Sequence, residues 1–377
     1  MVAFLVFLSI IGILFVKFLY SLIFKGYNDQ RASKGYKASW YGKDPPPTLN
    51  DGSQDDVSIH PFKIDIPSEV IEDLKNRLQR TRFEEPVEDS KFHYGFNPKY
   101  LKTVLEYWRS QYDWRKQEAE LNRFPQFKTR IEGINVHFLH IKPPLLQEST
   151  VLMPGSAKSF KTLRGPFGDK ISFFFKVVIG VHIFPLSWPD IIHQGKKEIY
   201  SFPLKKKIGM LLEEGGYFHI QATKPDTLGC GMADSPAGVA AYLLEKFGIS
   251  TDSQALNLDN GALTKKFTLD ELLTNVMMYW VNNNFTAAAR FYKENVRNVF
   301  SGRNEKAPVT VPSGVAVFPN EVLMVPKTMM SQQMKNIVSY SIMPRGGHFA
   351  ALEEPQLLAD DIFKFVAIVE RKDNSSQ

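Results

Sequence analysis

One histidine in the C-terminal part of the chain has the sequence context of a catalytic base. His348 follows two glycines in the run MPRGGHFAALEEP, directly after a β-rich segment and before a helical one. A histidine in this context lies on a loop at the carboxyl edge of a sheet, where ligand sites of open α/β sheets are found. Glycines allow backbone shapes that hold an imidazole over a cleft. A lone histidine is ordinarily a surface or core residue, but this context makes His348 a candidate general base.

Glu321 is the acidic residue that the same pattern pairs with His348. It lies just beyond the β-rich run Val315–Phe318, after Pro319 and Asn320. An acid and a histidine on loops after two successive strands form a base-orienting pair, in which the carboxylate fixes the tautomer and stabilises the imidazolium. Taken alone Glu321 is an ordinary surface charge. Paired with His348 it becomes a candidate orienting acid.

Two tyrosines carry the remaining candidate chemistry. Tyr217 lies in GGYFHIQATKPD and Tyr292 lies in RFYKEN. A phenol O–H donates a proton or a hydrogen bond to an oxygen that gains charge. The chain has 14 tyrosines, so residue chemistry alone does not select these two. Buried amphipathic packing is their ordinary interpretation.

The elements before the first parallel-sheet pattern are helices and a hairpin. Pro67 suits a first helical position, and a second helix is predicted after Pro98. Residues 127–142 alternate apolar and polar side chains around Glu132-Gly133, which predicts two short strands. The first helix has an apolar stripe at helical spacing, made by Val70, Ile71, Leu74 and Leu78. This order predicts an N-terminal cap region that precedes an α/β domain.

The C-terminal half predicts helices that alternate with closing strands of a parallel sheet. Ser235-Pro236 opens a helix through Lys246, and Thr268 with Glu271 forms a capping box for the helix that ends near Trp280. The β-rich runs are Val309–Phe318 and Asn336–Met343. The last helix starts at Glu354-Pro355, and we expect it to bury Leu357, Leu358, Ile362, Phe365 and Val366.

Composition narrows the class of protein. The 377 residues are 44% hydrophobic and 23% charged, which is typical of a globular protein with a core. The net charge of +6 is modest, and no Lys/Arg run alternates with aromatic residues as a nucleic-acid groove requires. Cys230 is the only cysteine, so the chain has no internal disulfide and no cysteine-rich metal site.

The N-terminus predicts a membrane anchor. Val2–Phe24 is mostly apolar and reaches a spanning length of roughly 20 residues if Lys17 snorkels. A buried core helix is the alternative interpretation. No basic start or cleavage site of a signal peptide is present, and positive charges gather after the span. The positive-inside bias then places the remaining chain in the cytosol. Residues 26–57, with three consecutive prolines, read as a linker.

Long motifs along the chain resemble those of the microsomal epoxide hydrolases and their insect juvenile-hormone relatives. The resemblance covers nearly the whole chain except 145 to about 190. It is found in MPRGGHFAALEEP, GGYFHIQATKPD, DSPAGVAAYLLEKF, KKFTLDELLTNVMMYW, WYGKD, IHPFKI, FHYGFN and INVHFLHIKPP. The resemblance implies an α/β-hydrolase fold with a helical lid, no metal or organic cofactor, and apolar epoxide substrates, xenobiotic or lipid-derived. It also implies a place in the endoplasmic reticulum membrane with the catalytic domain facing the cytosol.

The family mechanism gives each candidate residue a role. An aspartate attacks an epoxide carbon, and Tyr292 with Tyr217 as its partner stabilises the departing oxygen. The resulting ester is hydrolysed by water that His348 deprotonates, with Glu321 as the orienting acid. The products are vicinal diols. Such covalent catalysis divides one difficult step into two easier ones.

The nucleophile of that mechanism is not found in this sequence. The family has its aspartate on a strand-to-helix elbow in a G-G-D-W-G-like run, and its oxyanion run is H-G-W-P. Neither run occurs here. Met153–Ser156 is either the tail of the second run or part of the strand that follows the elbow. Two βαβ units of roughly 30 residues each would fill nearly all of the interval from Pro144 to Tyr217. Residues 157–190 instead read as lid-like. No β-run of useful length precedes Asp169, and Asp190 follows Pro189 in an apolar patch, so neither is expected to be the nucleophile. No G-x-S-x-G run offers a serine nucleophile.

We therefore predict an epoxide hydrolase whose central sheet is incomplete and whose activity is impaired. The alternatives are a non-catalytic membrane-anchored protein that binds apolar ligands or partners, or an unstable splice or gene-model product. The predicted regions are a membrane anchor at 1–25, a linker at 26–57, an N-terminal epoxide-hydrolase region with the first sheet strands at 58–150, a truncated core remnant with lid at 151–305, and the C-terminal part of the core at 306–377.

Overall fold

The computed structural model describes residues 56–131, 134–141, 209–210, 212–252, 254–301, 309–322, 327, 330–331 and 334–374. These residues divide into two compact units. The first takes in the described residues up to His60 together with Phe127–Phe138, and the second takes in Pro61–Gln126 and the described residues from Leu139 onward. The predicted anchor, nearly all of the predicted linker, and Met153–Ser156, Asp169 and Asp190 lie outside the described residues.

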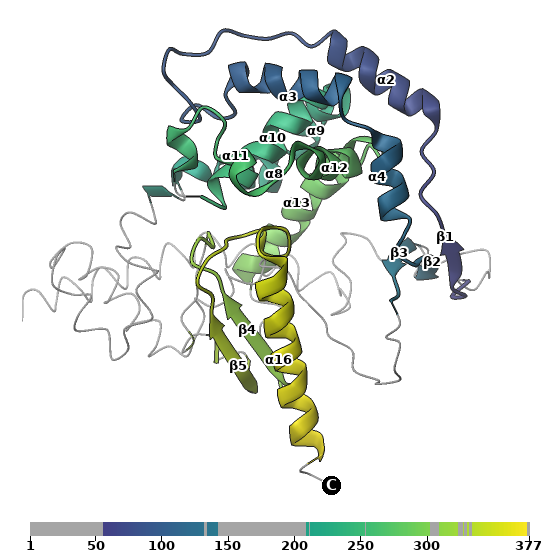
Figure 1. The fold of residues 1–377 in the computed structure, drawn as a ribbon, viewed down its shortest axis with the longest axis vertical. Coiled ribbons are helices and arrows are strands. Elements are labelled where there is room, and N and C mark those ends of the chain that lie inside the picture. The colour runs from purple at the N-terminus through teal and green to yellow at the C-terminus, as the bar shows by residue number, and fades with distance from the viewer. Residues whose placement is uncertain are drawn as a thin grey trace, which may run out of the picture. The chain divides into compact units, whose positions relative to one another are not determined.

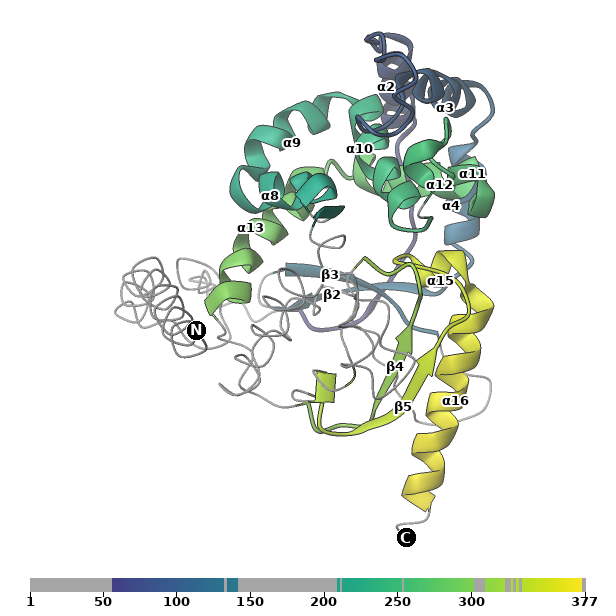
Figure 2. The ribbon, with the colours of Figure 1, turned by 90° about the vertical axis from the view of Figure 1, so that its left-hand side faces the viewer.

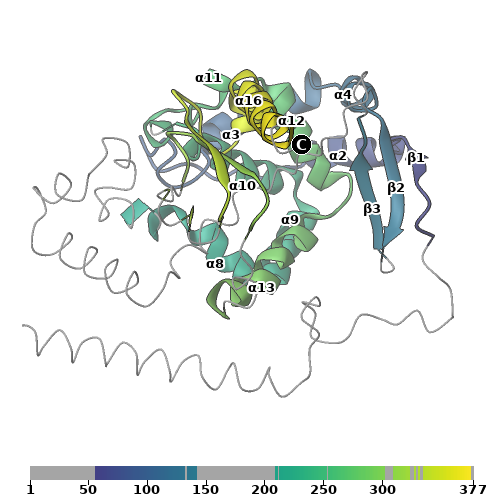
Figure 3. The same cartoon turned by 90° about the horizontal axis from the view of Figure 1, so that it is seen from below.

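A three-stranded sheet lies mostly in the first unit (Figure 3). Its strands are β1 (His60–Phe62), β2 (Gln126–Ile131) and β3 (Ile134–Leu139), in the order β1-β2-β3. Val136 and Phe138 are half-buried while Asn135 and His137 are exposed, as the alternating sequence predicts. The Phe127 and Phe138 rings stack across the strands at a centroid separation of 5.8 Å. The predicted hairpin is confirmed.

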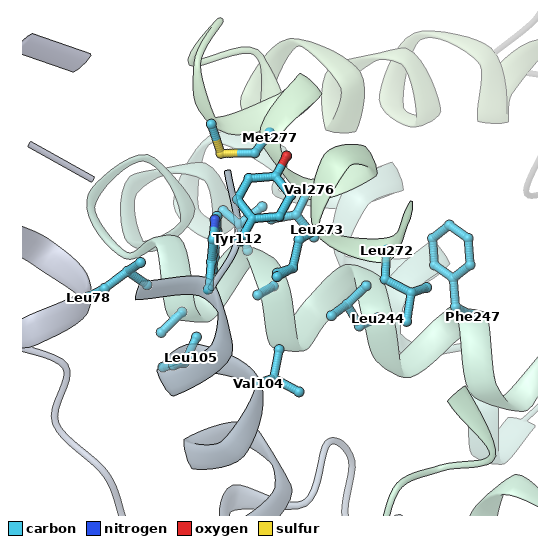
Figure 4. Packing of buried hydrophobic residues seen from close by; sticks show 14 of the residues in the cluster. Leu78, Val104, Leu105, Tyr112, Leu244, Phe247, Leu272, Leu273, Val276 and Met277 are labelled. Atoms are coloured by element: carbon cyan, nitrogen blue, oxygen red, sulfur yellow. The ribbon is translucent and has the colours of Figure 1, made fainter. Parts of the chain in front are cut away.

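Helices of the second unit pack around one apolar core. They are α2 (Ser68–Gln79), α3 (Pro98–Ser110), α4 (Trp114–Leu121), α10 (Pro236–Ile249) and α12 (Leu269–Trp280) (Figure 1). Val104 of α3 and Leu244 of α10 are completely buried, and Figure 4 shows them with the α12 residues Leu272, Leu273, Val276 and Met277. Full burial of one such aliphatic side chain contributes about 1.5–3 kcal/mol. This core holds in place the helices that position the candidate site.

The helix starts follow the capping residues of the sequence. The Ser235 side chain accepts a hydrogen bond from the Gly238 amide at the start of α10. Thr268 and Glu271 form both hydrogen bonds of a capping box at the start of α12, as predicted. Asn97 caps α3 by accepting from the amides of Lys99 and Tyr100.

Three further helices lie against one another and carry the candidate tyrosines. They are α8 (Gly216–Thr223), α9 (Pro225–Asp234) and α13 (Phe285–Ser301), and α13 packs against both others (Figure 2). Gly229 lets α9 approach α13 closely, because a Cβ at Gly229 would lie 2.7 Å from Cγ2 of Thr286. A Cβ would not fit there without a shift.

The C-terminal segment forms the predicted parallel strand pair. β4 (Ser313–Val317) and β5 (Ile337–Ile342) pair in parallel, and α16 (Pro355–Asn374) packs along them (Figure 2). Gly314 faces α16, where a Cβ would lie 2.9 Å from Cδ2 of Phe365. A short helix, α15 (Ala350–Glu353), separates the loop after β5 from α16. The carboxyl ends of β4 and β5 therefore meet at one sheet edge.

Several details of the predicted elements are corrected. Pro67 precedes α2 as its N-cap rather than occupying the first helical position, and α10 continues to Ile249 rather than ending at Lys246. The short α15 was not predicted. The five apolar residues expected to be buried by α16 are only half-buried, because β4 and β5 cover one side of this helix among the described residues.

The predicted location in the endoplasmic reticulum membrane is also corrected. Among the residues that the structure describes, no helix combines the length and the apolar character needed to cross a membrane. The longest described helix, α16, has 20 residues but carries several charged side chains. The run Val2–Phe24, on which the prediction rested, lies outside the described residues.

Candidate active site

His348 and Glu321 meet at the carboxyl edge of the β4–β5 pair. Glu321 follows β4 and His348 follows β5, and an isolated parallel bridge between Asn320 and Gly347 extends the strand pairing to this level. Nδ1 of His348 lies 2.7 Å from Oε1 of Glu321. A carboxylate only accepts hydrogen bonds, so the imidazole donates from Nδ1 and keeps Nε2 as its basic nitrogen.

The electrostatics of the pair favour a proton on the imidazole. The hydrogen bond to Glu321 raises the pKa of His348 above its ordinary value, and the charges of Glu321 and Glu353 act in the same direction, while burial opposes them. The side chains are 32% exposed at His348 and 22% at Glu321, so both are partly desolvated but reachable by water. This is the arrangement of an oriented general base.

The loop that carries His348 is tied to the helical core. The His348 amide donates to the Ser250 carbonyl at the end of α10, at 3.2 Å. The Phe349 ring stacks on Phe247 of α10 at a centroid separation of 4.0 Å and an interplanar angle of 9°. Gly347 allows this approach, since a Cβ there would lie 2.7 Å from the Ser250 carbonyl oxygen. The loop position is thus set by α10 as well as by β5.

Tyr217 of α8 and Tyr292 of α13 form the second part of the site. Their rings meet edge to face at a centroid separation of 6.2 Å and an angle of 82°. Burial raises the pKa of Tyr292 to about 12, with a smaller contribution from Tyr217. Burial also raises the pKa of Tyr217, followed by the charges of Glu321 and Glu245. Both phenols therefore stay protonated and able to donate at neutral pH.

The influence of Glu321 on Tyr217 links the two parts of the site. The same carboxylate that binds His348 also raises the pKa of Tyr217, so the tyrosine lies within its electrostatic reach. The structure therefore brings His348 and Glu321 into direct contact and Tyr217 and Tyr292 into direct contact. Glu321 couples the pairs electrostatically.

Charged residues around these groups were not predicted from the sequence. The Lys246 ammonium lies 5.1 Å from the centroid of the Tyr217 ring, within cation–π range. The Glu353 side chain is fully buried, and its carboxylate binds the Lys266 ammonium at 2.6 Å. The one sequence feature that could have marked Glu353 is its position directly after the apolar run Phe349–Leu352. Over the described ranges, no group of three or more His, Cys, Asp and Glu side chains has the arrangement of a metal site.

Comparison with known proteins identifies the family. Residues 59–160 match the family model described as "Epoxide hydrolase N terminus". The chain is 35% identical to "Epoxide hydrolase 1" of Sus scrofa, in an alignment that covers 88% of this chain and 93% of the pig protein. The chain belongs to the epoxide hydrolase family. It is also 34% identical to "Juvenile hormone epoxide hydrolase 2" of Ctenocephalides felis, over 85% of this chain and 89% of the flea protein.

The solved structures agree with the family. The crystal structure of juvenile hormone epoxide hydrolase from the silkworm Bombyx mori superposes with a TM-score of 0.75 at 26% identity, covering 89% of this chain and 100% of the silkworm chain. The predicted α/β-hydrolase fold and the resemblance to epoxide hydrolases are confirmed. Members of this family are hydrolases, and the family implies epoxide substrates.

The alignment with the pig relative is longer than this chain. That alignment extends over 426 residues, whereas this chain has 377 residues in all. The pig protein therefore contains positions that have no counterpart in this chain.

Proposed function

We propose that this chain binds apolar epoxides, keeps the water-activating part of the epoxide hydrolase mechanism, and lacks the nucleophile that forms the ester. The observation that carries the proposal is the His348–Glu321 hydrogen bond of 2.7 Å at the edge of a parallel strand pair. Two half-buried tyrosines, Tyr217 and Tyr292, contact each other, and the Glu321 charge acts on Tyr217. Membership of the epoxide hydrolase family gives the reaction class.

Each described residue takes a role that its surroundings favour. The Glu321 carboxylate holds Nδ1 of His348, so Nε2 takes a proton from water and the resulting imidazolium is stabilised. Tyr292 and Tyr217 keep their protons because burial raises the pKa of each phenol. Protonated phenols donate to an epoxide oxygen, which gains charge as its C–O bond breaks.

The proposed loss of the nucleophile rests on the sequence. The sequence of residues 157–190 has no pattern that predicts a strand–Gly elbow–helix series, and no G-G-D-W-G-like run occurs in the chain. The length of the pig alignment, which exceeds that of the chain, agrees with an internal deletion. Without an attacking aspartate, no alkyl-enzyme ester forms, and the His348 base has no ester to hydrolyse. We therefore propose that conversion of epoxides to diols by this chain is impaired.

Intact-mass spectrometry with calorimetry tests the proposal. The purified chain is incubated with styrene oxide and with a long-chain alkyl epoxide, and the expected result is saturable binding without a covalent adduct and without diol. The pig relative, treated in the same way, serves as the comparison for adduct and diol formation. A covalent adduct that accumulates in His348→Gln would contradict the proposal, because it would reveal a nucleophile elsewhere in the chain. Absence of any saturable binding would contradict the ligand-binding part.

A further inference from the structure

The buried ion pair between Lys266 and Glu353 lies beside the histidine loop and has no part in the proposed chemistry. Lys266 belongs to α11 (Leu263–Lys266) of the helical core, and Glu353 belongs to α15. Nζ of Lys266 lies 2.6 Å from Oε2 of Glu353, whose side chain is 0% exposed. Lys266 is 20% exposed, so the pair is largely shielded from solvent. A buried carboxylate needs such a partner, because an unpaired buried charge is strongly unfavourable.

The two oxygens of Glu353 bind different parts of the molecule. Oε1 accepts a hydrogen bond of 3.0 Å from the Phe349 amide, which is the backbone group directly after His348. Oε2 accepts the Lys266 ammonium. Glu353 therefore connects the histidine loop to α11 through one side chain.

Lys266 is also linked to the loop that carries Glu321. Its ammonium also donates to the Thr251 carbonyl at 3.1 Å. The Asn320 side-chain amide donates to the same carbonyl, also at 3.1 Å. Asn320 directly precedes Glu321. One carbonyl thus joins Lys266 to the loop that carries the orienting acid.

We infer that Lys266 and Glu353 are positioning residues, which hold the His348 loop and the Glu321 loop at the separation required for the His348–Glu321 hydrogen bond. The contacts made by the Lys266 ammonium and the Glu353 carboxylate are charge-assisted and largely shielded from solvent, which makes them strong and geometrically restrictive. This inference rests on the proposed role of His348 as the water-activating base. It deepens that role, because it assigns the geometry of the base to the helical core rather than to the strand pair alone.

Proton NMR of the chain labelled with ¹⁵N-histidine tests the inference. A proton held between a histidine Nδ1 and a carboxylate gives a low-field resonance, which is assigned here by its loss in His348→Gln and Glu321→Gln. We expect Lys266→Met to abolish this resonance or to shift it strongly upfield while circular dichroism still shows the native helices. Lys265→Met is the matched control, because the adjacent lysine makes a pair of the same 2.6 Å length with Asp252 but is 63% exposed. In Lys265→Met, the low-field resonance should stay at the wild-type position.

The outcomes separate this inference from the proposed function. An unchanged resonance in folded Lys266→Met would overturn the inference and leave the proposed function intact. If Lys266→Met does not fold, Glu353→Gln fills the same space and should also lose or shift the resonance; an unchanged signal there would overturn the inference equally. A wild-type spectrum without the resonance would overturn both the inference and the basis of the proposed function. Diol formation is not needed for any of these measurements.

Discussion

At the scale of single residues, the titration of His348 has a consequence for stability. Its pKa lies above the ordinary value of 6.5 in the folded chain, chiefly because of the hydrogen bond to Glu321. Because the pKa is raised in the folded state, protonation of His348 stabilises the folded chain. This contribution is fully present below pH 6.5 and is lost as the pH rises through the folded-state pKa. We expect the melting temperature to fall as the pH increases through the neutral range. Glu321→Gln should remove this decline, and melting curves that fall equally in both proteins would contradict the assignment.

Tyr292 supports a second prediction at the residue scale. Its pKa of about 12 means that the phenol is a hydrogen-bond donor at neutral pH. Tyr292→Phe should weaken the binding of styrene oxide by about 5- to 10-fold, since one neutral hydrogen bond contributes about 1 kcal/mol. Calorimetric titration measures the change. Tyr242→Phe is the control, because the Tyr242 hydroxyl is already bound by the Gln221 amide; an equal loss in this variant would contradict a specific role for Tyr292.

At the scale of elements, the approach of α9 to α13 depends on a glycine. A Cβ at Gly229 would lie 2.9 Å from Cβ of Thr286, so Gly229→Ala forces these helices apart. Overpacking of this kind costs about 1–3 kcal/mol, which outweighs the gain in helix propensity of about 1 kcal/mol. Gly231→Ala, two residues along the same helix, meets nothing within 4 Å and should stabilise the protein by up to about 1 kcal/mol. Denaturant unfolding measures both, and equal effects would contradict the packing argument.

The elements also show what the sequence could and could not predict. The capping box at Thr268 and the parallel order of β4 and β5 depend on local patterns, so both were predictable. The contact between Glu321 and His348 followed from the parallel order of these two strands. The four-residue α15 is too short to show a helical period. The contacts of Lys266 join residues far apart in the chain, and no spacing rule brings them together. The choice of tyrosines required the resemblance, because burial and ring contact are visible only in the fold.

At the scale of the whole molecule, the proposed loss of the nucleophile segment predicts that a graft from a relative restores the reaction. The alignment with the pig relative is longer than this chain, so that relative contains residues for which this chain has none. We predict that a chimera with the matching pig segment in place of 145–190 forms a covalent ester with styrene oxide and releases diol.

The reason is that the base, the acid and both tyrosines are contributed by described elements outside that segment. In the chimera, His348→Gln should slow hydrolysis of the ester by several orders of magnitude, so that the adduct accumulates in intact-mass spectra. A chimera with aspartate replaced by asparagine at the grafted elbow is the control and should form no adduct. A folded chimera that forms the ester but hydrolyses it equally well with His348→Gln would show that His348 is not the water-activating base of this chain.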